Sequence, residues 1–274
     1  MSPHARETRP FASEVKFLVD ADTGARIRDW ARLHMEPDPH GTGTFGDEYR
    51  TTSLYFDTGQ WDVFHRRGSF GRSKYRIRRY GDASSVFLER KLRKPGILVK
   101  RRTTVGLDTL DRLVTPEPDA EWPGDWFRRR LRLRRINPVC LVSYARMARS
   151  AITPDGAARL TLDEDVRVLG QAGFEVAPWR HDRRIGRERT NGGNGSGVLP
   201  VLHPTEAGQP VLEGQLILEL KYRHNLPAVF KRLVEEFALA PQSASKYRLG
   251  ITALEAIRPS MAAVLPAGDA APHV

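Results

Sequence analysis

Several stretches of the chain alternate apolar and charged residues, and most of the charged positions hold Lys or Arg. The stretch Lys74-Tyr75-Arg76-Ile77-Arg78 shows this alternation most clearly. Residues two apart in a β-strand share a face, so one face of such a strand carries cations and the other carries mainly apolar side chains. The pattern predicts a sheet that has one buried face and one cationic face.

The same arrangement recurs in strand after strand. Like charges that face one another across strands destabilise a sheet, and a solvated face normally mixes Lys with Thr, Ser and Glu. A bound polyanion therefore explains the repeated pattern better than exposure to solvent, which stays the alternative for any single strand. The cations that alternation places on the polar face are Lys16, Lys74, Arg76, Arg78, Lys91, Lys100, Arg102, Arg146 and Lys221.

Alternation and turn residues together predict about eight strands, mostly antiparallel, with helices at their ends. The strands are expected at about 14–20, 49–57, 72–80, 86–94, 97–104, 139–150, 159–169 and 211–222. Helices are expected at about 22–35, near 61–64, and at about 125–135, 226–237 and 246–257. Asp22 or Thr23 is the expected cap of the first helix, and Asn225 caps the fourth.

Many strands with a charged face favour a closed barrel over a sandwich. We therefore predict an α+β fold, an eight-stranded antiparallel β-barrel with flanking helices, as a single domain over residues 11–257. A disordered leader at 1–10 and a disordered tail at 258–274 flank the domain. Residues from about 170 to 210 are rich in Gly, Arg and Asn without periodicity, and we expect a flexible insertion there.

The net charge of +11 and the isoelectric point near 10.1 favour anionic partners, among them polyphosphate, nucleotides, nucleic acid and acidic lipid. The arginine-rich run at 128–135 fits contact with polyphosphate, RNA or acidic lipid, and fits a solvated helix face equally well. Charge alone does not choose among these partners.

Other features bear on where the protein works. No stretch approaches the ~18 consecutive apolar residues of a membrane span, and the polar N-terminus lacks the apolar core of a signal peptide. The sole cysteine, Cys140, excludes an internal disulfide framework. Its apolar neighbours favour a buried hydrophobe over a nucleophile. We expect a cytoplasmic protein without a membrane span.

Carboxylates are interspersed among the cations of the polar face. Glu89 shares a face with Lys91, and both a salt-bridge role and a direct role in the site stay open for it. Glu219 shares a face with Lys221 and is the better candidate for a metal ligand. Mg²⁺ and Mn²⁺ typically take one or two carboxylates together with phosphate oxygens and waters.

These residues carry a resemblance to a known family. The segments that match, in order, are Glu14-Val-Lys16-Phe, Ser53-Leu-Tyr-Phe-Asp57, Lys74-Tyr-Arg76-Ile-Arg78, Phe87-Leu-Glu89-Arg-Lys91, Val99-Lys100-Arg-Arg102, Ser143-Tyr144-Ala-Arg146, Leu162-Asp163, Leu218-Glu219-Leu-Lys221 and Ser245-Lys246-Tyr247. With them, the chain resembles the polyphosphate-polymerase domain of the VTC (vacuolar transporter chaperone) proteins. This family is a branch of the CYTH, or triphosphate tunnel metalloenzyme, superfamily. Ala12 departs from the superfamily's opening Glu-x-Glu-x-Lys, which weakens an adenylate-cyclase or thiamine-triphosphatase interpretation.

The resemblance implies a tunnel that binds triphosphate chains and an enzyme that transfers the γ-phosphate of ATP onto growing polyphosphate. It implies that Glu219 holds Mn²⁺ or Mg²⁺. The residues expected to serve catalysis are Lys16, Arg76, Arg78, Lys91, Lys100 and Lys246. Those expected to bind phosphate are Lys74, Arg102, Tyr144, Arg146, Lys221 and Ser245.

The alternatives are a triphosphatase of the same fold, which would act on inorganic triphosphate or nucleoside triphosphates, and a non-catalytic polyphosphate-binding module. No specific nucleic-acid partner is expected, because Tyr75 alternates away from Lys74 and Arg76 and so offers no stacking surface beside them. The expected partners are therefore ATP and inorganic polyphosphate or triphosphate. The oligomeric state stays open.

Overall fold

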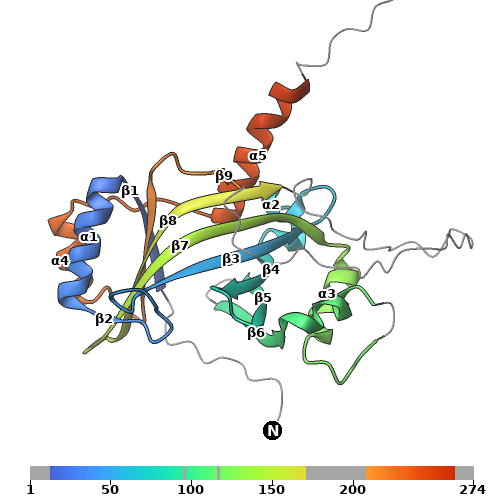
Figure 1. Ribbon diagram of the computed structural model, residues 1–274, viewed down its shortest axis with the longest axis horizontal. Coiled ribbons are helices and arrows are strands. Elements are labelled where there is room, and N and C mark those ends of the chain that lie inside the picture. The colour runs from blue at the N-terminus through green and yellow to red at the C-terminus, as the bar shows by residue number, and fades with distance from the viewer. Residues whose placement is uncertain (1–12, 95–96, 116–117, 171–207, 263–274) are drawn as a thin grey trace, which may run out of the picture.

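An antiparallel sheet of ten strands forms the centre of the protein (Figure 1). The computed structural model describes residues 13–94, 97–115, 118–170 and 208–262. Eight strands run across the sheet in the order β1-β10-β8-β7-β3-β4-β5-β6, while β2 pairs with β7 and β9 pairs with β8. The bounds are β1 Ser13–Val19, β2 Glu36–Pro37, β3 Glu48–Asp57, β4 Ser73–Tyr80, β5 Ser85–Lys94, β6 Ile97–Gly106, β7 Asn137–Thr153, β8 Gly156–Gly170, β9 Gln209–Pro210 and β10 Leu216–Tyr222.

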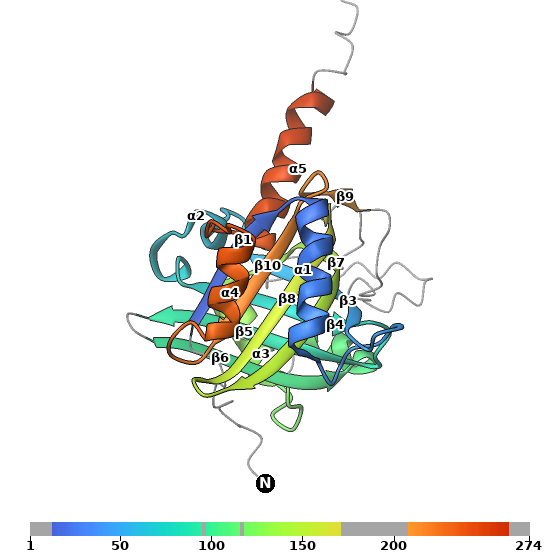
Figure 2. The ribbon, with the colours of Figure 1, turned by 90° about the vertical axis from the view of Figure 1, so that its left-hand side faces the viewer.

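The prediction of a closed eight-stranded barrel is wrong, because the sheet is open between its edge strands β1 and β6 and has ten strands. The sheet nevertheless curls strongly (Figure 2). The Nζ of Lys91 on β5 lies 3.5 Å from a carboxylate oxygen of Glu14 on β1. In a closed barrel, backbone hydrogen bonds would join the two edges of the sheet. Here an ion pair between side chains spans the opening instead. The α+β class and the antiparallel sheet with flanking helices are confirmed.

The two faces of the curled sheet differ in chemistry, as the alternation predicts. On the outer face, Ile77 and Leu88 belong to an apolar core with Phe127 of α3 (Asp125–Arg134). A second outer core, which includes Leu218, lies beneath the helices α1 (Ala21–His34) and α4 (Ala228–Glu236). The opposite, inner face carries most of the charged residues, and its cross-strand pairs include Arg76 with Glu89. Register thus places the predicted cations on the concave side of the sheet.

One end of the inner face is apolar and is covered by the start of α5 (Lys246–Ala262), the helix that projects from the body in Figure 1. Tyr247 of α5 packs in one cluster with Val142, Val168 and Ile217 of the sheet. A Cβ on Gly250 would lie 3.0 Å from Cγ2 of Val168, so the glycine allows the helix to approach this closely. The inner face is therefore apolar beneath α5 and charged along the rest of its length.

Local signals set the helix ends, with some differences from the prediction. Asp20 caps α1, because its carboxylate accepts a hydrogen bond of 2.7 Å from the backbone N–H of Thr23. The N-cap of α4 is Pro227 rather than Asn225. The short helix α2 spans Asp62–His65, and two 3₁₀ turns cover Gly68–Phe70 and Leu107–Leu113.

Some predicted segments lie mostly or wholly outside the described residues. They are the leader at 1–10, most of the insertion at 170–210 and most of the tail at 258–274, where the described chain ends with α5 at Ala262. None of the described helices is long and apolar enough to cross a membrane.

Candidate functional site

The inner face gathers the residues that the sequence singled out, from six strands and the start of one helix. Direct contacts connect many of them: the Nζ of Lys74 donates to Ser245 Oγ at 2.7 Å, and a guanidinium nitrogen of Arg78 donates to the Tyr144 hydroxyl at 3.1 Å. The predicted residues by element are Lys16 on β1, Lys74, Arg76 and Arg78 on β4, Lys91 on β5, Lys100 and Arg102 on β6, Tyr144 and Arg146 on β7, Glu219 and Lys221 on β10, and Ser245 and Lys246 at the start of α5.

Glu89 holds the cations of one side of the inner face in place. Its carboxylate lies 2.5 Å from Arg76, 2.5 Å from Arg102 and 3.4 Å from Lys100. Burial would raise the pKa of Glu89, but the arginines, Arg76 first and then Arg78 and Arg102, hold it well below its usual range. Glu89 is only 2% exposed, so it acts as a permanent anion that orients its neighbours. The salt-bridge interpretation of this residue is confirmed.

Asp163 on β8 plays the same part on the opposite side. Arg146 holds its two carboxylate oxygens in a two-point pair of 2.5 and 2.7 Å, and Lys246 makes a further ion pair. Burial opposes ionisation, yet Arg146 and Lys246 lower the pKa of Asp163 to about 2. The pair with Lys246 ties the start of α5 to the sheet. A planar guanidinium held at two points keeps its orientation.

Glu219 and Glu14 form a second acidic part of the inner face, around Lys16. Glu219 lies 2.6 Å from Lys221 and 3.7 Å from Lys16, while Glu14 lies 2.9 Å from Lys16. Burial raises the pKa of Glu219, but Lys221 and Lys16 hold it well below its usual range. Burial and then Glu219 raise the pKa of Glu14, but Lys16, Lys91 and Lys221 lower it overall. Both carboxylates are therefore anionic.

This acidic part also bears on the predicted metal. Within the described ranges, no three His, Cys, Asp or Glu side chains are grouped for a metal ion. Mg²⁺ and Mn²⁺ need only one or two carboxylates when phosphate oxygens and waters complete the coordination. The donor set of Glu219 with Glu14 beside it fits such an ion, which would compete with the lysines for the same oxygens.

Lys74 is held among other cations. Its Nζ donates to the hydroxyl of Ser245, and no ion pair within 4 Å joins it to any carboxylate of the described residues. Burial, and then the charges of Lys16, Lys91 and Arg76, lower the pKa of Lys74 to about 7. A bound anion in this place would relieve the repulsion.

Arg78 is likewise a buried cation whose direct partners are neutral. It is 6% exposed, and it donates to Ser53 Oγ at 3.1 Å and to the Tyr144 hydroxyl at 3.1 Å. No ion pair to Arg78 is found within the described part of the chain. The nearby Tyr80 responds to this charge: burial raises its pKa, but Arg78 and Arg102 lower it to about 7. Arginine side chains commonly bind phosphate through two parallel hydrogen bonds, as they do carboxylates.

Sequence reasoning missed the residues that fix the start of α5. The Tyr247 hydroxyl donates a short hydrogen bond to Asp57, the last residue of β3. The same carboxylate accepts from the backbone N–H groups of Val63 and Phe64 in α2, at 2.8 and 2.9 Å. Tyr247 follows the predicted Lys246, and Asp57 closes a segment of the resemblance, but only the fold shows that they touch.

Sequence reasoning also gave no role to Tyr80, Tyr55 and Ser53. All three offer hydroxyl groups to the arginines of β4 or β6. The sequence holds a signal for each of them. Tyr80 shares a strand face with Arg78, two residues away, and Ser53 and Tyr55 lie opposite Arg78 and Arg76 across β3 and β4.

The fold and its lining define a class of protein: a curled antiparallel sheet whose concave face is lined by buried and partly buried cations. The VTC domain family model matches residues 11–255, and the chain belongs to this family. A comparison with curated proteins gave no significant match.

Solved structures of low sequence identity are also similar. A protein from Bacillus halodurans proposed to be an adenylate cyclase is 14% identical, with a TM-score of 0.46, over 85% of this chain and 92% of that one. A Hippeastrum protein, named as a candidate adenylyl cyclase with a dominant triphosphatase activity, is 15% identical with a TM-score of 0.45, over 88% and 95%. The PH1819 protein of Pyrococcus horikoshii is 14% identical with a TM-score of 0.43, over 89% and 99%.

Proposed function

We propose that the protein is a metal-dependent polyphosphate polymerase that transfers the γ-phosphate of ATP onto a growing polyphosphate chain. The observation that carries this proposal is the state of Lys74 and Arg78. Both are largely buried cations on the inner face, and within the described residues their direct partners are hydroxyl groups rather than carboxylates. Keeping such charges buried costs stability, and a chain of phosphates is the ligand that best offsets this cost.

The cations of the inner face neutralise and align the phosphates in this proposal. Arg76 and Arg102 are fixed by Glu89, and Arg146 and Lys246 are fixed by Asp163, so their orientation is set before a ligand binds. Phosphoryl transfer gains most of its rate from positioning and from charge stabilisation in such preorganised sites. The residues therefore hold the donor triphosphate in line with an acceptor phosphate, without forming a covalent intermediate.

Glu219 is the residue that would hold Mn²⁺ or Mg²⁺, with Glu14 beside it. When bound, the ion supplies positive charge to the phosphate oxygens during transfer. Lys16 and Lys221 keep the Glu219 carboxylate deprotonated and oriented, since they contact its oxygens directly.

Membership of the VTC domain family supports the choice of the polymerase, although the same cationic lining would serve a triphosphatase in which water takes the place of the acceptor phosphate. The test is to incubate the purified protein with ATP and Mn²⁺ and to follow ADP, free phosphate and long-chain polyphosphate. Polymer with little free phosphate is the expected result. Free phosphate without polymer would make the protein a triphosphatase, and binding of short polyphosphate without turnover would make it a binding module.

Two variants sharpen this test. Glu219→Gln should abolish turnover while it spares much of the tripolyphosphate binding, because the cations that contact phosphate remain. Glu235→Gln on the exposed side of α4 is the matched control and should leave turnover unchanged. Unchanged turnover in Glu219→Gln, with the fold intact by circular dichroism, would remove this residue from the metal role.

A further inference from the structure

Tyr80, the last residue of β4, brings a hydroxyl group to the end of the inner face that lies away from α5. Lys74, near the start of the same strand, contacts Ser245 beside α5. About 20 Å of extended chain separates these two ends of β4. Because side chains two apart share a face of a strand, Tyr80 continues the row of Lys74, Arg76 and Arg78.

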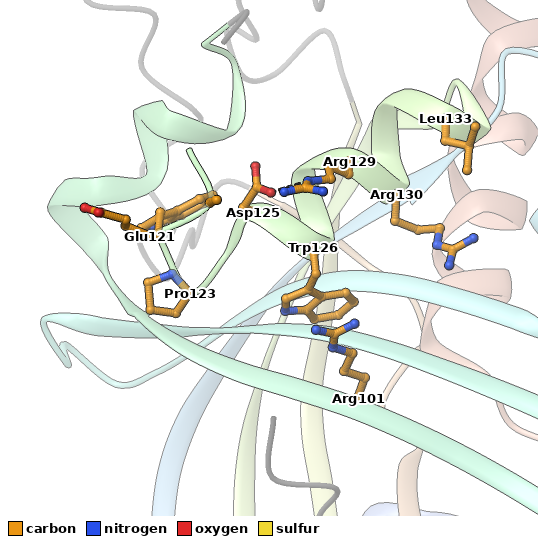
Figure 3. A pocket seen from close by; sticks show the side chains of 10 residues that line it. Arg101, Glu121, Pro123, Asp125, Trp126, Arg129, Arg130 and Leu133 are labelled. Carbon is orange, nitrogen blue, oxygen red and sulfur yellow. Dashed lines mark hydrogen bonds and ion pairs between the residues drawn. The ribbon is translucent and has the colours of Figure 1, made fainter. Parts of the chain in front are cut away.

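The hydroxyl of Tyr80 is held by Arg102 of the edge strand β6. Figure 3 shows the preceding residue, Arg101, against the indole of Trp126 on the outer side of β6, with the guanidinium 4.1 Å from the ring centre. Arg102 therefore points to the inner face, where it pairs with Glu89 and donates to the Tyr80 hydroxyl at 3.3 Å. A guanidinium only donates, so the Tyr80 oxygen accepts this bond and its proton remains for another acceptor.

Two aromatic rings fix the position of this phenol. Tyr49, the other titratable ring at this place, lies 5.5 Å from the Tyr80 ring and nearly perpendicular to it, at 89°. Phe87 lies 5.4 Å away at 61°. Tyr80 is partly exposed, and among the described residues none accepts a hydrogen bond from its hydroxyl. The phenol is thus a fixed donor without an acceptor in the described part of the chain.

The charges around Tyr80 are mainly positive. Burial raises the pKa of Tyr80, but Arg78 and then Arg102 lower it to about 7; Glu89 opposes this effect and Arg146 adds to it. Below about pH 7 the group is a neutral donor. Above that pH it is a phenolate that is attracted to the arginines and repels an incoming anion.

We propose that Tyr80 is a phosphate-contacting residue that donates its hydroxyl proton to an oxygen of a polyphosphate chain on the inner face. A phosphate oxygen is the acceptor that this hydroxyl lacks, and Arg78 and Arg102 supply positive charge beside it. An ionised phosphate oxygen accepts hydrogen bonds but donates none, so the phenol can contact it and the phenolate cannot. The inference rests on the phosphate-binding function proposed above and adds to it a contact that depends on one proton.

The variant Tyr80→Phe tests the proposal, because it keeps the ring and removes only the hydroxyl. Calorimetry measures the affinity for inorganic polyphosphate whose chains are long enough to cover the whole inner face, at constant ionic strength. The ionisation of the ligand and of Lys74 affects both proteins, so the ratio of their affinities isolates the hydroxyl. Tyr222→Phe is the control, since Tyr222 follows Lys221 on β10 and packs against the outer core.

At about pH 6 the wild type should bind polyphosphate roughly tenfold more tightly than Tyr80→Phe, the loss expected for a hydrogen bond to a charged acceptor. This advantage should disappear by about pH 8.5, because the phenolate must first take up a proton. The control should bind as the wild type does throughout.

Two results would overturn the proposal: equal affinities of wild type and Tyr80→Phe at about pH 6, or a ratio that stays constant as the pH rises. A constant ratio is what a purely structural role of the hydroxyl would give. Failure of the wild type to bind polyphosphate at any pH would refute the phosphate-binding function itself, and the inference with it. Turnover does not enter the measurement, so the absence of polymer synthesis would leave the result valid.

Discussion

Replacing Lys74 with Met should make the ligand-free protein more stable near neutral pH while it weakens the binding of tripolyphosphate. The ammonium group is buried among Lys16, Lys91 and Arg76, and these surroundings lower its pKa to about 7. Methionine fills a similar volume without a charge to desolvate. The substitution therefore separates two effects of the buried cation: the folding stability that it costs and the affinity for the ligand that it provides.

The magnitude follows from the pKa of Lys74 in the two states. In the unfolded chain the group titrates near 10.5, and in the folded protein near 7. Between these values folding releases a proton, so stability falls as the pH drops from 10.5 to 7, and the loss is complete below about 7. At about 1.4 kcal/mol per pH unit, the upper bound of this loss is about 5 kcal/mol. The lost hydrogen bond to Ser245 offsets about 1 kcal/mol of the gain in the variant.

Urea unfolding of the wild type and of Lys74→Met at about pH 6 and about pH 10.5 measures this difference. The variant should be more stable by at least about 1 kcal/mol at the lower pH. Its advantage should disappear at the higher pH, where the lysine is neutral in the folded protein and about half neutral in the unfolded chain, so that little of the cost remains. Lys231→Met on the exposed face of α4 is the control and should show no pH-dependent difference. A variant that is less stable at both pH values would refute the reasoning.

The protonation of Lys74 can also be followed when a ligand binds. At about pH 8.5, where Lys74 is mostly neutral and the phosphates are ionised, tripolyphosphate should raise the pKa of Lys74 and draw in close to one proton. Calorimetry in two buffers of different ionisation enthalpy reports this uptake. If Lys74→Met takes up as many protons as the wild type, the phosphates do not bind beside Lys74.

Two further substitutions test the groups that hold the site in place. Glu89→Gln should destabilise the protein by about 3–5 kcal/mol, because Arg76 and Arg102 lose their buried counter-ion. Tripolyphosphate should raise the melting temperature of this variant more than that of the wild type. An unchanged urea midpoint would contradict the role of Glu89 as the counter-ion of these arginines. Asp57→Asn should speed amide hydrogen exchange at the start of α5, because the hydrogen bond from Tyr247 to a charged acceptor is lost; equal exchange rates would show that this bond does not hold the helix.

The alternation of the sequence predicts the inner face well because a strand has a period of two. Once a segment such as Lys74 to Arg78 is known to be a strand, odd and even positions lie on opposite faces. The face of each side chain can then be predicted without knowing the neighbouring strands. Register adds which residues meet across strands, and Arg76 beside Glu89 is an example that the sequence leaves open.

Closure of the sheet and placement of α5 depend on interactions that no local pattern encodes. Whether β1 pairs with β6 is decided by the curl summed over all the strands between them, and the Glu14–Lys91 ion pair replaces the ladder that we expected. The contact of Tyr247 with Asp57 joins residues 190 positions apart in the chain. Such contacts arise only when the complete sheet brings its ends together.

The inner face divides its cations into two groups, and this division explains how a ligand would be received. Glu89 and Asp163 hold Arg76 and Arg146 in fixed ion pairs, so these arginines form a rigid wall. Among the described residues, Lys74 and Arg78 donate hydrogen bonds to hydroxyl groups and form no ion pair with a carboxylate, so phosphate can meet their charges at little cost in broken ion pairs. A phosphate chain should therefore gain most of its binding energy at β4, and the paired residues should contribute chiefly by keeping that strand's surroundings rigid and positive.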